Sequence, residues 1–368
     1  MTENIEIIEE GKVLSRIYSG SAVGDVLKYI SDYPSVFIVY DRNVGHLLPA
    51  LSGNPKLKGS FPIKATEDGK VMDTVLSICN WLLENNADRN ALLLAVGGGI
   101  VTDMAGFSAS IYKRGIRFAY IPTTLLSQVD AAIGGKTGVN FHSYKNMLGV
   151  IRQPVFTFLC PQPLSTLPFR DFVSGEAELL KTFIISNIPE NSYQKCIALL
   201  SDIFSSPDRA EAITSHQDEL QDLIHRAAAI KAGVVSRDQY EKGERRKLNL
   251  GHTFAHAIES IARSSVPEID ITHGEAVAMG IVAAARLSER MAEDEAGRRP
   301  KLETEIAADF ARCGLPVKMP FPFEDLAKAM AKDKKAEGDR IHFVLIRAIG
   351  DTCDRELTIE EAMSKLVR

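Results

Sequence analysis

Short apolar runs alternate with amphipathic segments along the first half of the chain. Residues 35–40, 91–96 and 117–121 are β-branched, aromatic or aliphatic almost throughout, which is typical of buried strands. Apolar side chains recur at helical spacing over residues 73–85, and a helical pattern follows the glycines at 97–99. Strands that alternate with helices predict an α/β domain with an open sheet.

From about residue 168 onward the pattern becomes mainly helical, without a linker at the boundary. An amphipathic helix is expected over residues 303–312, and a short apolar strand after the lysines at 334–335. At 368 residues the chain exceeds the usual size of one core, so two domains are expected. We place an α/β domain over residues 1–168 and a mainly α-helical domain over residues 169–368.

Composition is that of an ordinary soluble globular protein, with 45% hydrophobic and 25% charged residues. The net charge of -5, with acidic and basic residues interspersed, disfavours nucleic acid or an anionic membrane as a partner. Five scattered cysteines without C-x-x-C spacing favour a reducing compartment. The acidic start lacks a signal-peptide pattern, and the most apolar run, residues 276–287, is too short to span a bilayer, so a cytoplasmic protein is expected.

Polar and glycine residues follow the three strands, where ligands sit in open α/β sheets. Gly97–Gly99 would bring backbone N–H groups against a pyrophosphate, but the spacing is not G-x-G-x-x-G, and a structural turn explains the glycines about as well. Thr123 and Thr124 could donate to a nucleotide or cap the next helix. Asp41 could hold ribose hydroxyls or be a turn residue.

Glycine, lysine and asparagine are dense in the segment IGGKTGVNFHSYKNMLG, which predicts an anion-binding loop. The alternative is a solvated loop. The residues that favour anion binding are Gly134, Gly135, Lys136, Asn140, Lys145 and Asn146.

The segment KLNLGHTFAHAIE, residues 247–259, constrains the function most. If it is helical, His252 and His256 lie four residues apart on one face, with Asn249 a turn earlier, although Gly251 weakens a continuous helix. Two imidazoles aimed at one point are half of a typical divalent metal site. The alternative is a pair of surface or core histidines on an amphipathic helix.

Two further segments carry groups of the same kind. Glu178 and Lys181 share a helix face beside apolar residues, where a surface salt bridge would be the ordinary explanation. Glu178, His252 and His273 would complete a three-ligand site that leaves positions open for water or substrate. A cationic pocket around it would suit a small substrate with phosphate and carboxylate groups, and its candidate residues are Lys136, Lys181, Lys231, Arg245 and a lysine of the 334–335 pair.

The sequence resembles a known family, the 3-dehydroquinate synthases. The motifs that carry the resemblance are GGGIVTD, KRG, PTTLLSQVDAAIGGKTGVN, KNMLG, GEAELLK, the Glu241 to His256 spacing, HGEAV and DKK. They occur in order between about Asp41 and Gly350, which is nearly the whole chain. More distant relatives are other sugar phosphate cyclases and metal-dependent glycerol and alcohol dehydrogenases.

The resemblance implies a Rossmann-like N-terminal NAD-binding domain and a helical C-terminal metal-binding domain, usually in a homodimer. It implies conversion of 3-deoxy-D-arabino-heptulosonate 7-phosphate to 3-dehydroquinate and phosphate, in the shikimate pathway of aromatic amino acid biosynthesis. In such enzymes NAD oxidises the C5 hydroxyl, phosphate is eliminated, the same cofactor returns its hydride, and an aldol step closes the ring.

The resemblance also assigns residues. Glu178, His252 and His273 match the metal ligands, usually for zinc or cobalt, and His256 matches the proton carrier near the C5 hydroxyl. The positions that match substrate-gripping or ordering groups are Lys136, Asn146, Lys181, Lys231, Arg245, Asn249, Asp130, Glu241 and Lys334 or Lys335. Arg114 matches an arginine that reaches the neighbouring subunit's site. The positions that match NAD contacts are Asp41, Asn43, Glu67, Lys70, Gly98, Gly99, Asp103, Thr123, Thr124, Lys136, Lys145 and Thr166.

One departure is visible at residues 66–70, TEDGK, where many relatives have Gly-Glu ahead of a lysine. Two other enzymatic functions stay open: another sugar phosphate cyclase, and a glycerol-dehydrogenase-like oxidoreductase that releases NADH. Lys231, Asn249 and His256 favour a carboxylated substrate, since without one buried cations would lack a counter-charge. A nucleotide-binding scaffold without activity is disfavoured by the intact metal-ligand pattern.

Overall fold

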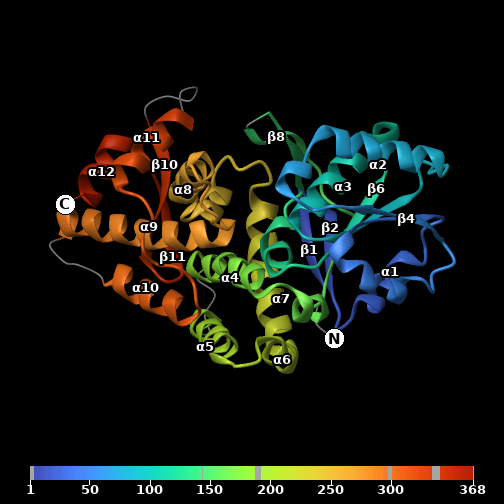
Figure 1. Ribbon diagram of the computed structural model, residues 1–368, viewed down its shortest axis with the longest axis horizontal. Coiled ribbons are helices and arrows are strands. Elements are labelled where there is room, and N and C mark those ends of the chain that lie inside the picture. The colour runs from blue at the N-terminus through green and yellow to red at the C-terminus, as the bar shows by residue number, and fades with distance from the viewer. Residues whose placement is uncertain (1–3, 143, 187–191, 297–300, 334–339, 368) are drawn as a thin grey trace. The chain divides into compact units, whose positions relative to one another are not determined.

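The computed structural model describes residues 4–142, 144–186, 192–296, 301–333 and 340–367 (Figure 1). The chain divides into two compact units. The first contains Met1–Pro168 and Ile213–Tyr240, and the second contains Phe169–Ala212 and Glu241–Arg368.

The first unit is built on a seven-stranded sheet in the order β1-β2-β9-β6-β5-β3-β4. All neighbouring strands are parallel except β1, which pairs antiparallel with β2. The strands are β1 (Ile5–Glu9), β2 (Lys12–Ser19), β3 (Val36–Asp41), β4 (Leu57–Ile63), β5 (Leu92–Gly97), β6 (Arg117–Pro122) and β9 (Phe156–Leu159). The three runs that predicted strands form β3, β5 and β6, near the centre of the sheet.

The strand β5 explains why its sequence is apolar without alternation. Leu93 and Ala95 belong to a core cluster on one side of the strand, while Leu92, Leu94 and Val96 belong to a second cluster on the other. Both faces are therefore buried, as expected for a central parallel strand. Strand order reverses between β3 and β5, because β4 follows β3 on one side and β5 lies on the other. Such a switch point is where open α/β sheets bind ligands.

Helices of the first unit are α1 (Leu27–Ile30), α2 (Met72–Glu84), α3 (Gly99–Ile111) and α7 (Gln217–Arg237). The predicted division into residues 1–168 and 169–368 differs from the structure at α7, which packs against β1 and β2 although it comes from the second half of the sequence. Ser236 illustrates this, because its hydroxyl accepts a hydrogen bond from the Ile8 amide at 3.0 Å. Helical periodicity gives the buried face of a helix but not the partner of that face.

The segment predicted to be an anion-binding loop forms a β-hairpin, so the prediction of a loop is wrong. Its strands are β7 (Lys136–Phe141) and β8 (Tyr144–Ile151), which pair antiparallel. Gly138 lies opposite Gly149, and a Cβ atom on Gly149 would lie 2.1 Å from the Thr137 carbonyl oxygen. Gly138 and Gly149 therefore allow the two strands to approach closely. In the sequence, the high glycine content of the segment indicated a loop instead.

The second unit is mainly helical, as predicted. Its elements are α4 (Phe169–Ile184), α5 (Ser192–Ser205), α8 (His252–Ser264), α9 (His273–Ala296), α10 (Leu302–Arg312), α11 (Phe323–Asp333), α12 (Ile359–Leu366) and the hairpin β10 (Arg340–Ala348) with β11 (Asp351–Thr358). The helix α6 (Arg209–Ser215) crosses the division between the units. In Figure 1 the long helix α9 runs through this unit, and it contacts α4, α8, α10 and α12.

Small residues let α8 and α9 approach closely. A Cβ atom on Gly280 would lie 2.2 Å from the Gly251 carbonyl oxygen, and one on Gly251 would lie 2.8 Å from the Ile281 amide nitrogen. Gly251 also has φ of 80°, which favours glycine. Among the described residues, no helix combines the length and apolarity needed to cross a membrane.

Candidate functional site

Three ligand-type side chains meet in the second unit, each from a different helix. Glu178 lies in the buried α4, while His252 and His273 are the first residues of α8 and α9. The Nε2 atoms of both histidines lie 3.5 Å from Oε1 of Glu178. One ligand atom from each residue lies within 4.8 Å of the others. The structure therefore brings together the three residues predicted to bind a metal.

The helix that carries His252 begins later than a continuous helix over residues 247–259 would. A short 3₁₀ helix, η7 (Glu244–Asn249), precedes it, and Gly251 separates the two in a left-handed conformation. Asn249 is therefore not on the same α-helix as His252 and His256, so that expectation is wrong. The close approach to α9 requires a glycine at this position.

Both ligand histidines have a second partner that holds the ring. Nδ1 of His252 lies 3.2 Å from the Leu250 carbonyl oxygen, and Nδ1 of His273 lies 3.5 Å from Oε1 of Glu259. Metal-binding histidines commonly use their other nitrogen in this way, which fixes the tautomer and the ring orientation. Sequence reasoning missed Glu259, although it lies seven residues after His252 and thus on the same face of α8.

Lys181 forms a buried ion pair with Glu178, since Nζ contacts Oε2 and both side chains are almost completely inaccessible to solvent. The ordinary explanation from the sequence, a surface salt bridge, is therefore wrong. Burial alone would raise the pKa of Glu178, but Lys181 and the two histidines hold it well below its usual value. The carboxylate is therefore ionised, as a metal ligand must be.

The two histidines have opposite pKa shifts. Burial and the charge of Lys181 lower the pKa of His252 to about 3. Burial also disfavours the His273 imidazolium, but hydrogen bonds to Glu178 and Glu259 outweigh it and raise the pKa of His273 to about 10. The carboxylates of Glu178 and Glu259 thus favour a positive charge at His273. A divalent cation bound to this ring would supply that charge in place of the ring proton. A donor set of one carboxylate and two imidazoles fits zinc or cobalt.

Other predicted residues of the second unit lie near this cluster in sequence. The ring centroids of His252 and His256 are 5.7 Å apart, and the His256 side chain is exposed. Asn249 donates from Nδ2 to Oε1 of Glu241, whose backbone has φ of 59°. Arg245 is buried. Lys334 and Lys335 lie outside the described residues.

In the first unit, several predicted cofactor positions follow the carboxyl ends of β3, β5 and β6. Gly98 precedes the first residue of α3, and Cβ atoms on Gly98 and Gly99 would lie 3.0 Å from Thr124 and Ala131 side-chain atoms. Strand, glycine turn and helix therefore follow one another as predicted. This arrangement presents a helix N-terminus at the switch point of the sheet, where a pyrophosphate would fit.

Two of these residues, Asp41 and Thr124, also serve local structure, as the sequence alternatives allowed. Asp41 accepts a hydrogen bond from the Asn43 amide at 3.0 Å. Thr124 and Ser127 cap one another, because the Ser127 amide donates to the Thr124 hydroxyl at 3.1 Å and the Thr124 amide donates to the Ser127 hydroxyl at 3.2 Å. Their contact with a cofactor stays a prediction.

Lys70 is a predicted NAD position and is buried. It links a second predicted NAD position, Asp103, with a predicted substrate position, Asn146. Nζ of Lys70 donates to Oδ2 of Asp103 at 2.6 Å and to Oδ1 of Asn146 at 2.5 Å. Burial raises the pKa of Asp103 more than Lys70 lowers it. Glu67 lies with Lys70 in the segment 66–70, where the sequence departs from the family pattern. It accepts a hydrogen bond from Nδ2 of Asn140 at 2.9 Å. Glu67 and Lys70 therefore both contact the β7–β8 hairpin.

Lys231, which is buried, forms a second ion pair in the first unit with the partly exposed Asp130. Nζ of Lys231 donates to Oδ1 of Asp130 at 2.6 Å and to its carbonyl oxygen at 2.7 Å. Arg114 is exposed in a turn where Lys113 and Arg114 have φ of 48° and 65°. The remaining predicted residues of this unit are Thr123, which is buried directly after β6, Lys136 and Lys145 in the hairpin, and Thr166, whose hydroxyl donates to the Pro163 carbonyl at 3.2 Å.

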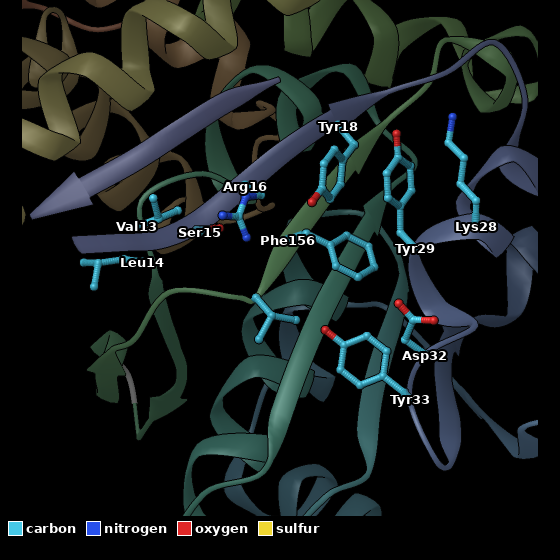
Figure 2. Close-up of a pocket in the computed structure, with 11 residues that line it drawn as sticks. Val13, Leu14, Ser15, Arg16, Tyr18, Lys28, Tyr29, Asp32, Tyr33 and Phe156 are labelled. Atoms are coloured by element: carbon cyan, nitrogen blue, oxygen red, sulfur yellow. The ribbon is translucent and has the colours of Figure 1, made fainter. Parts of the chain in front are cut away.

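A separate pocket of about 410 Å³ lies on the first unit, between β2, α1 and β9 (Figure 2). Four aromatic side chains line it, those of Tyr18, Tyr29, Tyr33 and Phe156, and Tyr18 and Tyr29 stack with ring centroids 3.8 Å apart. None of the predicted site residues lines this pocket. This pocket is therefore not part of the predicted site.

Comparison with known proteins gives consistent matches along the chain. A family model described as 3-dehydroquinate synthase N-terminal matches residues 60–174, and one described as 3-dehydroquinate synthase C-terminal matches residues 175–336. The 3-dehydroquinate synthase of Pyrococcus abyssi (strain GE5 / Orsay) is 40% identical over 309 residues, covering 83% of each chain. That of Latilactobacillus sakei subsp. sakei (strain 23K) is 34% identical over 352 residues, covering 94% of this chain and 92% of the relative.

Solved structures share the fold. The 2-epi-5-epi-valiolone synthase of Streptomyces hygroscopicus subsp. jinggangensis 5008, with NAD+ and Zn2+ bound, has a TM-score of 0.80 at 27% identity and covers 97% of this chain and 96% of its own. A 2-deoxy-scyllo-inosose synthase has a TM-score of 0.80 at 22% identity and covers 99% of both chains. A probable glycerol dehydrogenase from Sinorhizobium meliloti 1021 reaches only 0.60 at 16% identity, covering 95% of both chains.

The fold is therefore that of the sugar phosphate cyclases, with a Rossmann-like unit and a mainly helical unit, and the predicted fold class is confirmed. Within that class, the two family models and the sequence relatives identify the group more narrowly. The chain belongs to the 3-dehydroquinate synthase family.

Proposed function

We propose that the chain converts 3-deoxy-D-arabino-heptulosonate 7-phosphate to 3-dehydroquinate and phosphate, as a carbon–oxygen lyase of the shikimate pathway. Membership of the family supports this activity, since its named relatives are 3-dehydroquinate synthases. The single structural observation that carries the proposal is the convergence of Glu178, His252 and His273. A small, phosphorylated substrate is expected, and neither nucleic acid nor a membrane.

Glu178, His252 and His273 would hold one divalent ion, zinc or cobalt. The ion would act as a Lewis acid that lowers the pKa of a substrate hydroxyl. Glu259 and the Leu250 carbonyl would keep the two imidazoles neutral at Nε2 and pointed at the ion. His256 is the proposed proton carrier, one turn after His252 on α8.

NAD is the proposed organic cofactor, bound by the first unit. When bound there, NAD would supply reversible hydride transfer, so that no NADH is released in a turnover. The glycine turn at residues 97–99 supports the assignment, because its backbone N–H groups and the α3 N-terminus suit a pyrophosphate. The valiolone synthase with the same fold was solved with NAD+ and Zn2+.

The proposed NAD contacts are the positions carried over from the family, and two of them, the buried Lys70 and the partly buried Asp103, form a pair. Lys70 is held by Asp103, so each residue fixes the other near the helix N-terminus. The remaining proposed contacts are Asp41, Asn43, Glu67, Gly98, Gly99, Thr123, Thr124, Lys136, Lys145 and Thr166.

Cationic and amide side chains would grip the substrate's phosphate and carboxylate groups. Lys231 and Asn249 are each held by a carboxylate, from Asp130 and Glu241 respectively, which supports ordered rather than freely moving groups. Ordered donors strengthen binding because less side-chain entropy is lost. The other proposed substrate contacts are Lys136, Asn146, Lys181, Arg245 and one of Lys334 and Lys335.

We propose further that the protein is a cytoplasmic homodimer. The family expectation for Arg114 supports the dimer, since it would reach the neighbouring subunit's site. Its exposed position in a turn of positive φ agrees with a role outside its own core.

Phosphate release tests the function. The purified chain is incubated with the heptulosonate phosphate, and phosphate and absorbance at 340 nm are followed with and without chelator and added NAD. Release of phosphate with no net NADH, lost on chelation, is expected. Steady accumulation of NADH would indicate a glycerol-dehydrogenase-like oxidoreductase instead. Phosphate release from a hexose phosphate, and not from the heptulosonate, would indicate another cyclase.

A further inference from the structure

The start of α9 is attached to α4 by a set of contacts in addition to the one between the proposed ligands Glu178 and His273. Arg170 lies in the first turn of α4, and its guanidinium holds both carboxylate oxygens of Glu275, from Nε at 2.9 Å and from a terminal nitrogen at 2.8 Å. The same terminal nitrogen donates to the Asp270 carbonyl oxygen at 2.7 Å, and the other contacts the Asp270 carboxylate. One side chain therefore grips α9 and the segment that precedes it.

The residues gripped by Arg170 lie on either side of His273. The Thr272 amide donates to Oε2 of Glu275 at 2.8 Å, and the Glu275 amide donates to the Thr272 hydroxyl at 3.3 Å. This reciprocal pair is a capping box, with the carboxylate three residues after the hydroxyl. Since Glu275 is also held by Arg170, the position of the cap is fixed relative to α4.

A second contact lies one turn further along α4. The Gly274 amide donates to the Ser174 hydroxyl at 3.0 Å. A Cβ atom on Gly274 would lie 1.8 Å from the Ser174 carbonyl oxygen, so the two backbones touch here.

These contacts have a common register. Arg170, Ser174 and Glu178 are four residues apart, which places them on one face of α4. They meet Glu275, Gly274 and His273 in turn, three successive residues of α9. The ligand contact between Glu178 and His273 is thus the third step of a ladder whose first step is the Arg170–Glu275 pair.

We propose that Arg170 is a positioning residue for the metal site, which sets the place of His273 relative to Glu178 through Glu275 and the α9 cap. The inference rests on the proposed metal site. If Arg170 were only a surface ion pair, its loss would change neither metal affinity nor ligand geometry, because exposed pairs contribute little beyond local stability. Asp270 and Arg170 are both substantially exposed, so a large effect on overall stability is not expected.

The test measures zinc affinity by competition with a chromophoric chelator, and the absorption spectrum of bound Co2+, for five purified full-length proteins: the wild type, R170Q, R170K, R226Q and H273A. R170Q should raise the zinc Kd about tenfold, at the low end for residues that act through a ligand's surroundings, and should alter the Co2+ spectrum. R170K keeps the charge but not the bidentate fork, so it should recover only part of the affinity. R226Q removes a comparable exposed pair with Asp222, and it should bind zinc like the wild type.

Wild-type zinc affinity and an unchanged Co2+ spectrum in R170Q would overturn the inference, provided that H273A loses zinc. If H273A also kept its zinc, the proposed metal site itself would fail. Should R170Q not fold, S174A removes only the middle step and takes its place in the same assay. Weaker zinc binding by S174A would support the ladder, and unchanged binding would overturn it.

Discussion

Glu259 and His273 form a pair in the second unit, with Oε1 of Glu259 3.5 Å from Nδ1 of His273. The pair joins the middle of α8 to the start of α9, and it leaves Nε2 of His273 facing Glu178. Glu259 is buried, so this carboxylate has little competition from water. It is therefore expected to orient the ring and to increase its basicity as a ligand.

The substitution E259Q should weaken zinc binding about 10- to 100-fold, because the neutral amide supports His273 less well than the carboxylate does. Zinc affinity by chelator competition measures the effect. The control is E305Q on the exposed side of α10, which should bind zinc normally. If E259Q bound zinc as tightly as the wild type, the role assigned to Glu259 would be wrong.

Lys181 is expected to stabilise the metal-free protein. In K181M the buried carboxylate of Glu178 loses its cation, which should lower the free energy of unfolding by about 3 kcal/mol. Urea unfolding with and without zinc measures this. Because a bound divalent ion would replace part of the lost charge, zinc should stabilise K181M more than it stabilises the wild type. Equal stabilisation of the two proteins by zinc would contradict the arrangement.

Glu176 lies two residues before Glu178 on the same helix, but its carboxylate has no such role. It is fully buried, and within the described parts of the chain neither of its oxygens has a hydrogen-bond partner. Burial raises its pKa well above the usual value. Burying a polar group without a partner is unfavourable, so E176M should raise the free energy of unfolding by about 1–3 kcal/mol. Zinc affinity should stay unchanged in E176M and be lost in E178M, and a destabilised E176M would show that the carboxyl group has a necessary partner.

Lys70 offers a test confined to the first unit. In K70M, Asp103 and Asn146 lose their shared donor, so NADH should bind at least about tenfold more weakly, as when a charged hydrogen bond is removed. Fluorescence titration with NADH measures the affinity, and zinc binding serves as the internal check, since it should not change. K328M, which removes an exposed pair with Asp325, is the matched control. Unchanged NADH affinity in K70M would argue against the assigned NAD position.

Much of the first unit could be predicted from local patterns. The central strands are apolar on both faces, so β3, β5 and β6 were recognisable as short uninterrupted runs. The hairpin of β7 and β8 was not, because its segment is rich in glycine, lysine and asparagine and burial does not alternate along its strands. The place of α7 in the first unit depends on long-range packing, which helical periodicity does not specify.

The metal-ligand set was predictable because the family motifs mark Glu178, His252 and His273. Their supporting residues were harder to find. Glu259 has a local signal, its position seven residues after His252 on α8. Arg170 and Ser174 have only their four-residue spacing from Glu178, which acquires meaning once the start of α9 is known to lie against that face of α4.

The most direct test is the zinc content of the purified chain compared with that of H252A, measured together with phosphate release from the heptulosonate phosphate. The account predicts one zinc ion per wild-type chain, and the loss of both ion and turnover in a folded H252A protein. Retention of a full equivalent of zinc and of undiminished phosphate release by H252A would contradict it.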